Sequence, residues 1–257
     1  MKFVKYSTKN RIAFITIDRP DKRNALNDQL VNELTEAFSQ AAENKKAKVI
    51  ILKASGEVFC AGADLTYLRQ LQNNSFEENL VDSRNLKQLF YTIYTSKKLV
   101  IAQVQGHAIA GGAGLVTVCD FAFTRPEAKF GYTEVKIGFV PAIVMIFLVR
   151  KIGETKAKEL LLTGNLIDAK EAKYYGLVNR IFPADKLASE TLQFAENLCT
   201  QNSSDSMALT KQMLGKIQSL PLNEALEYAA QMNAQARATQ DCHNGIAAFL
   251  DKKNISW

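Results

Sequence analysis

The stretch AIAGGAGLVTVCD, residues 108–120, places three glycines in four positions and then continues directly into apolar residues. Glycine is costly inside a regular element, because its backbone loses more conformational freedom on folding than that of any other residue. The apolar run nevertheless predicts a helix over 111–118. Two explanations for the glycines stay open here: they allow backbones to pack closely, or they leave backbone N–H groups free for a ligand.

A second glycine-containing segment, FCAGADL (59–65), has the same setting, in which a buried-type strand leads into a helix. Amides in the first turn of a helix have no internal hydrogen-bond partner and lie at the positive end of the helix dipole. Two such donors that converge on one point can hold a developing oxyanion, and each is worth about 3 kcal/mol of transition-state stabilisation. Neither segment is a phosphate loop, since GxxxxGK[ST] and GxGxxG are both absent.

The segments around these glycines predict a parallel sheet. KVIILKA (48–54) and LVIAQVQG (99–106) are nearly unbroken apolar runs, which are typical of strands covered on both faces. Between them lies a mostly helical stretch, 65–95, that is interrupted by the polar QNNS (72–75). The alternating order of strands and helices indicates parallel strands joined by crossover helices.

The remaining segments predict one α/β unit with a helical C-terminal part. Residues 3–18 alternate with period two and indicate a hairpin, and Asn27 or Asp28 can cap the helix that follows. The further elements that the pattern predicts are strands over 121–125, 128–132 and 177–182 and helices near 185–200, 206–218, 222–239 and 241–251. We therefore assign 1–195 to the core and 196–257 to a C-terminal helical region of the same structural unit.

Composition excludes several classes of protein. The 257 residues can bury a full core, and the net charge of +6 comes from scattered Lys and Arg without a basic run, so nucleic-acid binding is not indicated. The four cysteines lie far apart, which predicts neither a zinc site nor a disulfide framework. The longest apolar run, 137–149, is too short for a membrane span and contains Pro141. The N-terminus is unlike a signal peptide, so we expect a cytoplasmic, reduced protein.

Six blocks of the sequence resemble, in the same order, the enoyl-CoA hydratase/isomerase (crotonase) superfamily. They are RPDKRNALN, FCAGADL, GHAIAGGAGL, CDFAFTRPEAKFGYTEVKIGFVP, LLLTG followed by AKEAKYYGLVN, and GIAAFLDKKNISW. The resemblance implies an α/β fold, a crotonase-like spiral of ββα units with a helical C-terminal region that mediates trimers, often paired as hexamers. It also implies acyl-CoA thioesters as substrates, with no separate cofactor and no metal.

The resemblance implies that two backbone N–H groups stabilise a thioester enolate, and here these are the amides of Ala63 and Gly111. The family's acid/base carboxylate corresponds to Glu134, in FGYTEVKIG. A carboxylate beside the Cα or Cγ of a bound enoyl thioester can take and return a proton, and burial would raise its pKa toward the working pH. Without the resemblance, Glu134 is a polar residue in a short strand–loop segment.

The sequence departs from the family at two places. Hydratases of the family carry a second glutamate six residues before the aspartate of CD, where this chain has Gly114. Hydration needs a base for the water and a proton donor for the α-carbon, and two carboxylates can divide these tasks. Isomerisation of a double bond needs only one base, which removes a proton at one carbon and returns it at another while the enolate stays bound. The second departure is PAIVM (141–145) in place of a glycine-rich segment, which predicts a bulkier and more apolar acyl pocket wall.

The coenzyme A moiety is expected, by resemblance, against the loops RPDKRNAL and AGADL. The residues expected there are Lys22, Arg23, Ala25, Ala61, Asp64 and Leu65. Lys22 and Arg23 would lie near the phosphates, although exposed basic loop residues are as often only solvated. By the same resemblance, Lys252 or Lys253 of a neighbouring subunit would also contact the coenzyme A moiety. Asp64 can in addition cap the helix that follows it.

Five further residues have a structural interpretation beside a functional one. His107 is expected to be a satisfied structural histidine, but a related decarboxylase lacks the first acid and uses a His or Lys, which makes His107 a candidate replacement acid. His243 is expected at the surface. Tyr132 is expected to pack rather than to contact the acyl group, and Cys60 and Cys119 are expected to be small core residues.

Three classes of function stay open. The first is an enoyl-CoA hydratase or a Δ3,Δ2-enoyl-CoA isomerase with Glu134 as acid/base. The second is a decarboxylase or dehydratase of branched acyl-CoA, of the methylglutaconyl type. The third is a non-catalytic family member that binds acyl-CoA or RNA, which the pI near 9.0 and the absent carboxylate at Gly114 would suit.

Overall fold

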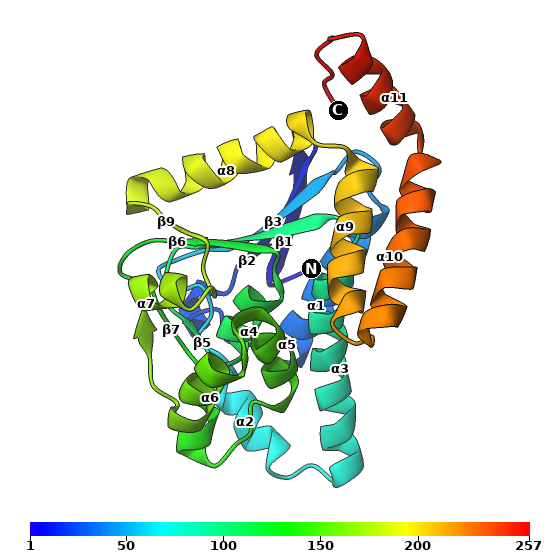
Figure 1. Cartoon of the computed structure of the whole chain (residues 1–257). Coiled ribbons are helices and arrows are strands. Elements are labelled where there is room, and N and C mark those ends of the chain that lie inside the picture. Colours follow the sequence, from blue (N-terminus) through cyan, green and yellow to red (C-terminus); the bar gives the residue numbers. More distant parts are fainter.

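The computed structural model describes residues 1–257, and its centre is a six-stranded sheet with the order β1-β2-β3-β4-β6-β9 (Figure 1). The strands are β1 Val4–Lys9, β2 Ile12–Ile17, β3 Val49–Ala54, β4 Leu99–Val104, β6 Phe121–Thr124 and β9 Arg180–Ile181. β1 and β2 form an antiparallel hairpin, and every other neighbouring pair is parallel. The predicted hairpin and the predicted parallel sheet are therefore confirmed.

Helices occupy most of the remaining chain. They are α1 Asp28–Glu43, α2 Leu65–Leu71, α3 Phe76–Thr95, α4 Gly111–Val118, α5 Ala142–Ile152, α6 Glu154–Thr163, α7 Ala169–Tyr174, α8 Ala184–Gln201, α9 Ser204–Ile217, α10 Leu222–Arg237 and α11 Gln240–Leu250, with the short 3-10 helices η1 Pro20–Lys22 and η2 Glu134–Ile137. The helix predicted after the three glycines is α4, and the side chain of Asn27 caps α1 by accepting from the N–H of Leu30 at 3.0 Å. None of the helices combines the length and the apolar character that a membrane span needs.

Both faces of the large sheet are covered, which explains why its strands are continuous apolar runs. On one face α8 packs Leu187, Ala195 and Cys199 against Ile51 and Phe123 (Figure 1). On the other face α1, α3 and α4 share one larger apolar cluster with the sheet. The boundary that we assigned between the core and the C-terminal region, after residue 195, lies inside α8. Cys199, one turn further along this helix, still packs against the sheet.

A second, three-stranded sheet positions the ends of two loops. Its strands are β5 Ala108–Ile109, β7 Lys129–Gly131 and β8 Ile167–Asp168. β5 and β7 are parallel, with Ile109 opposite Gly131, and β8 is antiparallel to β7. α4 begins two residues after β5, and η2 begins three residues after β7. The loops that follow β5 and β7 therefore leave this sheet at the same edge.

The strand predicted over 177–182 is shorter in the structure. Arg180 and Ile181 pair with β6, and the flanking N–H groups of Asn179 and Phe182 donate to it as well. The N–H groups of Leu177 and Val178 instead both donate to the carbonyl oxygen of Ala172, at 2.9 and 3.2 Å. These bonds close the C-terminal end of α7 instead of extending the sheet. The apolar side chains at 177 and 178 are buried all the same, which is why the sequence pattern is that of a strand.

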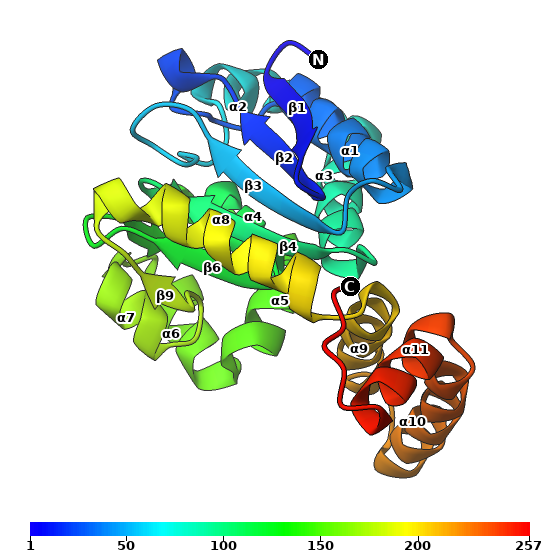
Figure 2. The ribbon, with the colours of Figure 1, turned by 90° about the horizontal axis from the view of Figure 1, so that it is seen from above.

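The C-terminal helices α9, α10 and α11 extend away from the two sheets (Figure 2). All four helices predicted from residue 185 onward are present, with ends within about three residues of the predicted ones. α9 is joined to the sheets by an ion pair of 2.7 Å between Lys211 and Asp120, the residue just before β6. Leu222, Leu226 and Phe249 of this extension are exposed.

Candidate active site

The first glycine corner lies where β5 ends and α4 begins. Ala110 joins the two elements at a φ of 51°, a left-handed conformation that is strained for a residue with a Cβ. Its N–H donates to the carbonyl oxygen of Gly131 at 2.7 Å. No side chain caps the N-terminus of α4, and the N–H of Gly111 donates to no other group of the chain. The corner therefore presents a free backbone donor at the positive end of a helix dipole.

The second corner lies just before α2. The N–H of Leu26 donates to the carbonyl oxygen of Gly62 at 2.7 Å, and the carbonyl oxygen of Leu26 accepts from the N–H of Asp64 at 2.8 Å. Successive N–H groups of an extended segment point in opposite directions, so the N–H of Ala63 points away from Leu26. It donates to no other group of the chain, and Ala63 is exposed.

The two corners are packed directly against each other. The N–H of Ile109 donates to the carbonyl oxygen of Cys60 at 3.0 Å. A Cβ on Gly62 would lie 2.9 Å from the Cβ of Ala110, and a Cβ on Gly112 would overlap the carbonyl oxygen of Cys60. Close packing is therefore a real requirement at Gly62 and Gly112. Both corners also contact Leu26, which pairs with Ala63 and whose Cδ1 lies 2.9 Å from the Cβ position of Gly111.

Glu134 follows β7 much as Gly111 follows β5. Because these strands are parallel, the segments that leave their carboxyl ends lie at the same edge of the sheet. Glu134 Oε2 is buried and has no hydrogen-bond partner in the chain. Burial raises the pKa of the Glu134 carboxyl group above its ordinary value, since the charged form is poorly solvated there. A group suited to proton transfer thus shares an edge of the sheet with a free backbone donor.

The position of the second family glutamate is filled by apolar side chains. A Cβ on Gly114 would lie 2.5 Å from Cγ2 of Val144 and 2.8 Å from Cζ of Phe90. Val144 belongs to the segment PAIVM and is buried, in agreement with the predicted apolar bulk, and Phe90 is fully buried. A carboxylate side chain has no room at this point, so the edge carries Glu134 without a second acid from α4.

The two loops expected to contact coenzyme A are hydrogen-bonded to each other. The N–H of Ala61 donates to the carbonyl oxygen of Arg23 at 3.1 Å, and the guanidinium of Arg19 donates to the carbonyl oxygen of Ala25 at 2.9 Å. Lys22 and Arg23 are exposed. Leu65 is exposed as well, whereas Ala25 is buried and Ala61 is half-buried. These bonds hold the loop of Lys22, Arg23 and Ala25 against the loop of Ala61, Asp64 and Leu65.

Asp64 anchors the second corner. Its carboxylate accepts from the N–H of Thr66 at 2.8 Å, which confirms the predicted helix cap, and pairs with Arg19 at 2.7 Å. Burial acts to raise the pKa of Asp64, but the hydrogen bond from Arg19 and those from the amides of Thr66 and Tyr67 outweigh it, so this pKa lies below its ordinary value. The negative charge of Asp64 is thus neutralised by Arg19 and by backbone amides of α2, and these bonds fix the second corner in place.

The other residues singled out from the sequence lie apart from this edge. His107 is exposed, and its Nδ1 accepts from the N–H of Lys129 at 3.1 Å, next to the amino-terminal ends of β5 and β7. It is therefore at the opposite end of these strands from Gly111 and Glu134, which disfavours it as a replacement acid. His243 is exposed on α11, as expected. Cys60 and Cys119 are buried, as expected.

Three residues that the sequence did not single out complete the surroundings of α4. Phe90 fills the space beside Gly114, although no local pattern links α3 to that position. Lys151 of α5 donates to the carbonyl oxygens of Thr117 and Cys119 at 3.1 and 2.6 Å, which places a cation at the negative end of the α4 dipole. Thr117 is the one polar side chain of α4, and this contrast with its apolar neighbours could have marked it in the sequence as a residue with a buried hydrogen bond.

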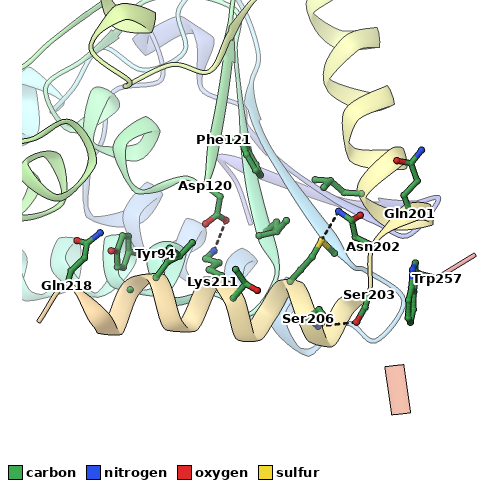
Figure 3. A pocket seen from close by; sticks show the side chains of 16 residues that line it. Tyr94, Asp120, Phe121, Gln201, Asn202, Ser203, Ser206, Lys211, Gln218 and Trp257 are labelled. Carbon is green, nitrogen blue, oxygen red and sulfur yellow. Dashed lines mark hydrogen bonds and ion pairs between the residues drawn. The ribbon is translucent and has the colours of Figure 1, made fainter. Parts of the chain in front are cut away.

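A cavity of about 750 Å³ lies at the other end of α4, between α3, α8 and α9 (Figure 3). Tyr94 and Trp257 contribute to its walls, and so do Asp120 and Lys211, which form an ion pair. Burial raises the pKa of Asp120, although the charge of Lys211 opposes this. An eight-residue helix is about 12 Å long, so α4 separates this cavity from the free amide of Gly111. The cavity is therefore distinct from the candidate site.

Known proteins are similar to this chain over nearly its whole length. The sequence model of the enoyl-CoA hydratase/isomerase family matches residues 7–257. A Thermus thermophilus protein provisionally named enoyl-CoA hydratase is 41% identical over 245 residues, which cover 95% of this chain and 96% of that protein. The 2,3-dehydroadipyl-CoA hydratase of Escherichia coli is 32% identical and covers 96% of this chain, with 95% of that protein covered.

A solved structure agrees with the sequence comparisons. The crystal structure of an enoyl-CoA hydratase from Shewanella pealeana has a TM-score of 0.94 to this chain, at 28% identity, and covers 99% of this chain and 96% of that one. The agreement includes the helical C-terminal region as well as the two sheets. The match over residues 7–257 and the shared architecture show that the chain belongs to the enoyl-CoA hydratase/isomerase family and has the crotonase fold.

Proposed function

We propose that the protein is an acyl-CoA enzyme that moves a double bond, as a Δ3,Δ2-enoyl-CoA isomerase. The observation that carries the proposal is the combination of one half-buried carboxylate, Glu134, whose Oε2 is buried without a hydrogen-bond partner, with apolar side chains packed around Gly114. Isomerisation needs one base that removes a proton and returns it elsewhere. Hydration needs in addition a group that activates water, and Val144 and Phe90 occupy the place where the family carries it.

In the proposed reaction the thioester oxygen accepts hydrogen bonds from the N–H groups of Ala63 and Gly111. Glu134 removes a proton from C2 of a 3-enoyl-CoA, and the electrons of the broken C–H bond form a dienolate whose negative charge rests on that oxygen. The same carboxyl group then delivers the proton to C4, which gives the 2-enoyl-CoA. This proton transfer from C2 to C4 consumes no water and needs no metal or cofactor. The raised pKa of Glu134 brings its basicity closer to the working pH.

The proposed substrate site uses the paired loops for the coenzyme A moiety. Lys22 and Arg23 would meet its phosphates, since both are exposed and cationic. Ala25, Ala61, Asp64 and Leu65 would shape the groove around the adenine and the pantetheine. The same proposal includes assembly into trimers or hexamers, which the exposed Leu222, Leu226 and Phe249 of the helical extension support; sedimentation velocity tests this, and a monomer would contradict it.

Hydration of 2-enoyl-CoA is the second candidate, because relatives at 41% and 32% identity carry hydratase names. The two reactions are separated by offering the purified protein a 3-enoyl-CoA and a 2-enoyl-CoA in D₂O. Isomerisation predicts conversion of the first substrate and deuterium at C2 or C4 without water addition. Formation of a 3-hydroxyacyl-CoA from the second substrate would instead support hydration.

Variants connect the reaction to the carboxylate. Glu134→Gln should lower turnover by about 10²- to 10⁴-fold, the usual contribution of a positioned acid/base. Glu127→Gln is the matched control, since Glu127 is an exposed glutamate shortly before β7 whose distance to Arg125 is 3.8 Å. Decarboxylation of a branched substrate, or RNA binding that weakens steeply with salt, would each favour another class of function. Coenzyme A binding without any turnover would favour a binding protein.

A further inference from the structure

A buried hydrogen bond connects the segment of Glu134 to the helix of Gly111. The hydroxyl groups of Tyr132 and Thr117 lie 2.6 Å apart. Tyr132 stands two residues before Glu134, and Thr117 lies in the last turn of α4. Tyr132 is fully buried and Thr117 is 3% exposed, so water does not compete for this bond.

The direction of the bond follows from the available acceptors. The hydroxyl of Thr117 donates to the carbonyl oxygen of Ala113 at 2.8 Å and has a single proton. Its oxygen can therefore accept the proton of Tyr132, which has no other hydrogen-bond partner in the chain. Burial raises the pKa of the Tyr132 phenol, so it stays a donor at any physiological pH. The result is a relay from Tyr132 to Thr117 to Ala113.

The relay connects the helix that carries the Gly111 amide to the segment that carries the Glu134 carboxylate. Ala113 lies in the first turn of α4, two residues after Gly111, whose N–H is free. At the other end, Glu134 Oε2 has no hydrogen-bond partner, and the one hydrogen bond that acts on the carboxyl group comes from the backbone of Glu134 itself, so the position of the carboxylate follows the backbone of its segment. The segment is held by the relay and by the bond between Ala110 and Gly131.

We infer that Tyr132 and Thr117 are positioning residues that set the separation between the Glu134 carboxylate and the Gly111 amide. The inference rests on the proposed function, in which these two groups act on one substrate. Proton transfer depends on this separation, because a misplacement of about 1 Å can cost about 100-fold in rate. A structural role alone would lower stability without acting on the proton-transfer step.

The test compares Tyr132→Phe, Thr117→Val and the double variant with the parent enzyme. Each single variant should lower kcat about 10- to 100-fold with KM within about twofold, since binding of coenzyme A does not involve the relay. The double variant should lose no more than the worse single one, because both substitutions break the same hydrogen bond. Unchanged kcat, or a double loss equal to the product of the single losses, would overturn the inference.

Thr191→Val is the matched control. Thr191 is also fully buried, and its hydroxyl donates to the carbonyl oxygen of Leu187 at 2.7 Å, four residues earlier in α8. It should lower the melting temperature, though by less than Thr117→Val, which also leaves the buried Tyr132 hydroxyl unpaired, while kcat stays at the parent value. An equal loss of kcat in Thr191→Val would show that the effect is general destabilisation.

A measurement without turnover separates this inference from the proposed function. The Glu134 carboxyl resonance, identified in ¹³C-glutamate-labelled protein by its loss in Glu134→Gln, is titrated in the parent and in Tyr132→Phe. A loosened segment admits water, so the pKa of Glu134 should fall toward its ordinary value in Tyr132→Phe. An inactive parent would end the proposed function, and an unchanged titration in Tyr132→Phe would end the inference about the relay.

Discussion

Cγ2 of Val144 lies 2.5 Å from the position that a Cβ on Gly114 would occupy. Real Cβ atoms do not approach other carbons this closely, and Val144 is β-branched and buried, so it cannot turn aside easily. The contact makes glycine a packing requirement at the point where the family's hydratases carry a carboxylate.

Gly114→Ala should therefore destabilise the protein. The overpacking costs about 1–3 kcal/mol, and the better helix propensity of alanine returns about 1 kcal/mol of it. Urea unfolding measures the net loss. Adding Val144→Ala should restore part of the stability lost through Gly114→Ala, because it removes the methyl group that clashes. Gly114→Ala that is as stable as the parent would show that Val144 and Phe90 move apart at no cost.

The pH dependence of turnover should report the buried carboxylate. Because burial raises the pKa of Glu134, the acid limb of kcat/KM should lie above the range of an ordinary glutamate. Activity should rise as the pH passes upward through that pKa, since the base must be ionised to accept the proton. A profile of kcat/KM in H₂O with a 3-enoyl-CoA measures the limb. An acid limb in the range of exposed glutamates would contradict the assignment of Glu134 as the base.

Glu134→Gln should be at least as stable as the parent at neutral pH. A raised pKa means that the folded state holds the proton more tightly than the unfolded chain does, so the parent loses stability as the pH rises through the folded pKa of Glu134. The amide does not ionise and avoids that loss. Thermal unfolding at about pH 8 and about pH 5 should show the gain of the variant at the higher pH alone. A gain of equal size at both values would point to another cause.

Removing Arg19 should weaken the corner that carries Ala63. Arg19→Met leaves the buried carboxylate of Asp64 without its ion-pair partner, which should cost about 2 kcal/mol at neutral pH. Because the pKa of Asp64 is lowered in the folded protein, its contribution is present at neutral pH and is lost as the pH falls through that pKa. The difference between Arg19→Met and the parent should therefore shrink in acid.

Lys158→Met is the control for this loss. Lys158 pairs with Glu154 on an exposed helix face, where water screens the charges, so its removal should leave urea unfolding unchanged. If Arg19→Met behaved like Lys158→Met, the Arg19–Asp64 pair would be no more than a surface contact. KM for the acyl-CoA should rise in Arg19→Met alone, because the paired loops then lose their fixed shape.

Much of the architecture could be predicted because it depends on local patterns. The apolar runs at 48–54 and 99–106 can be satisfied only by burial on both faces, and they form β3 and β4. The polar QNNS separates α2 from α3, as its composition predicts. The strand expected at 177–182 failed over its first residues, because Ala172 takes up the N–H groups that a strand would have used.

For the candidate site too, some features could be predicted from the sequence and others depend on tertiary packing. By itself, the sequence indicated the family, through six blocks in order, and that resemblance named Ala63, Gly111 and Glu134 as the candidate site residues. It also predicted most of the helices and strands around them, because turns, caps and apolar periodicity act over a few neighbouring residues. Only the tertiary structure decided that Phe90 and Val144 occupy the space beside Gly114, that Tyr132 bonds to Thr117, and that His107 lies at the far end of its strand. The physical reason is that these contacts join residues 15 to 30 positions apart, whose meeting depends on how sheets and helices pack rather than on any local preference.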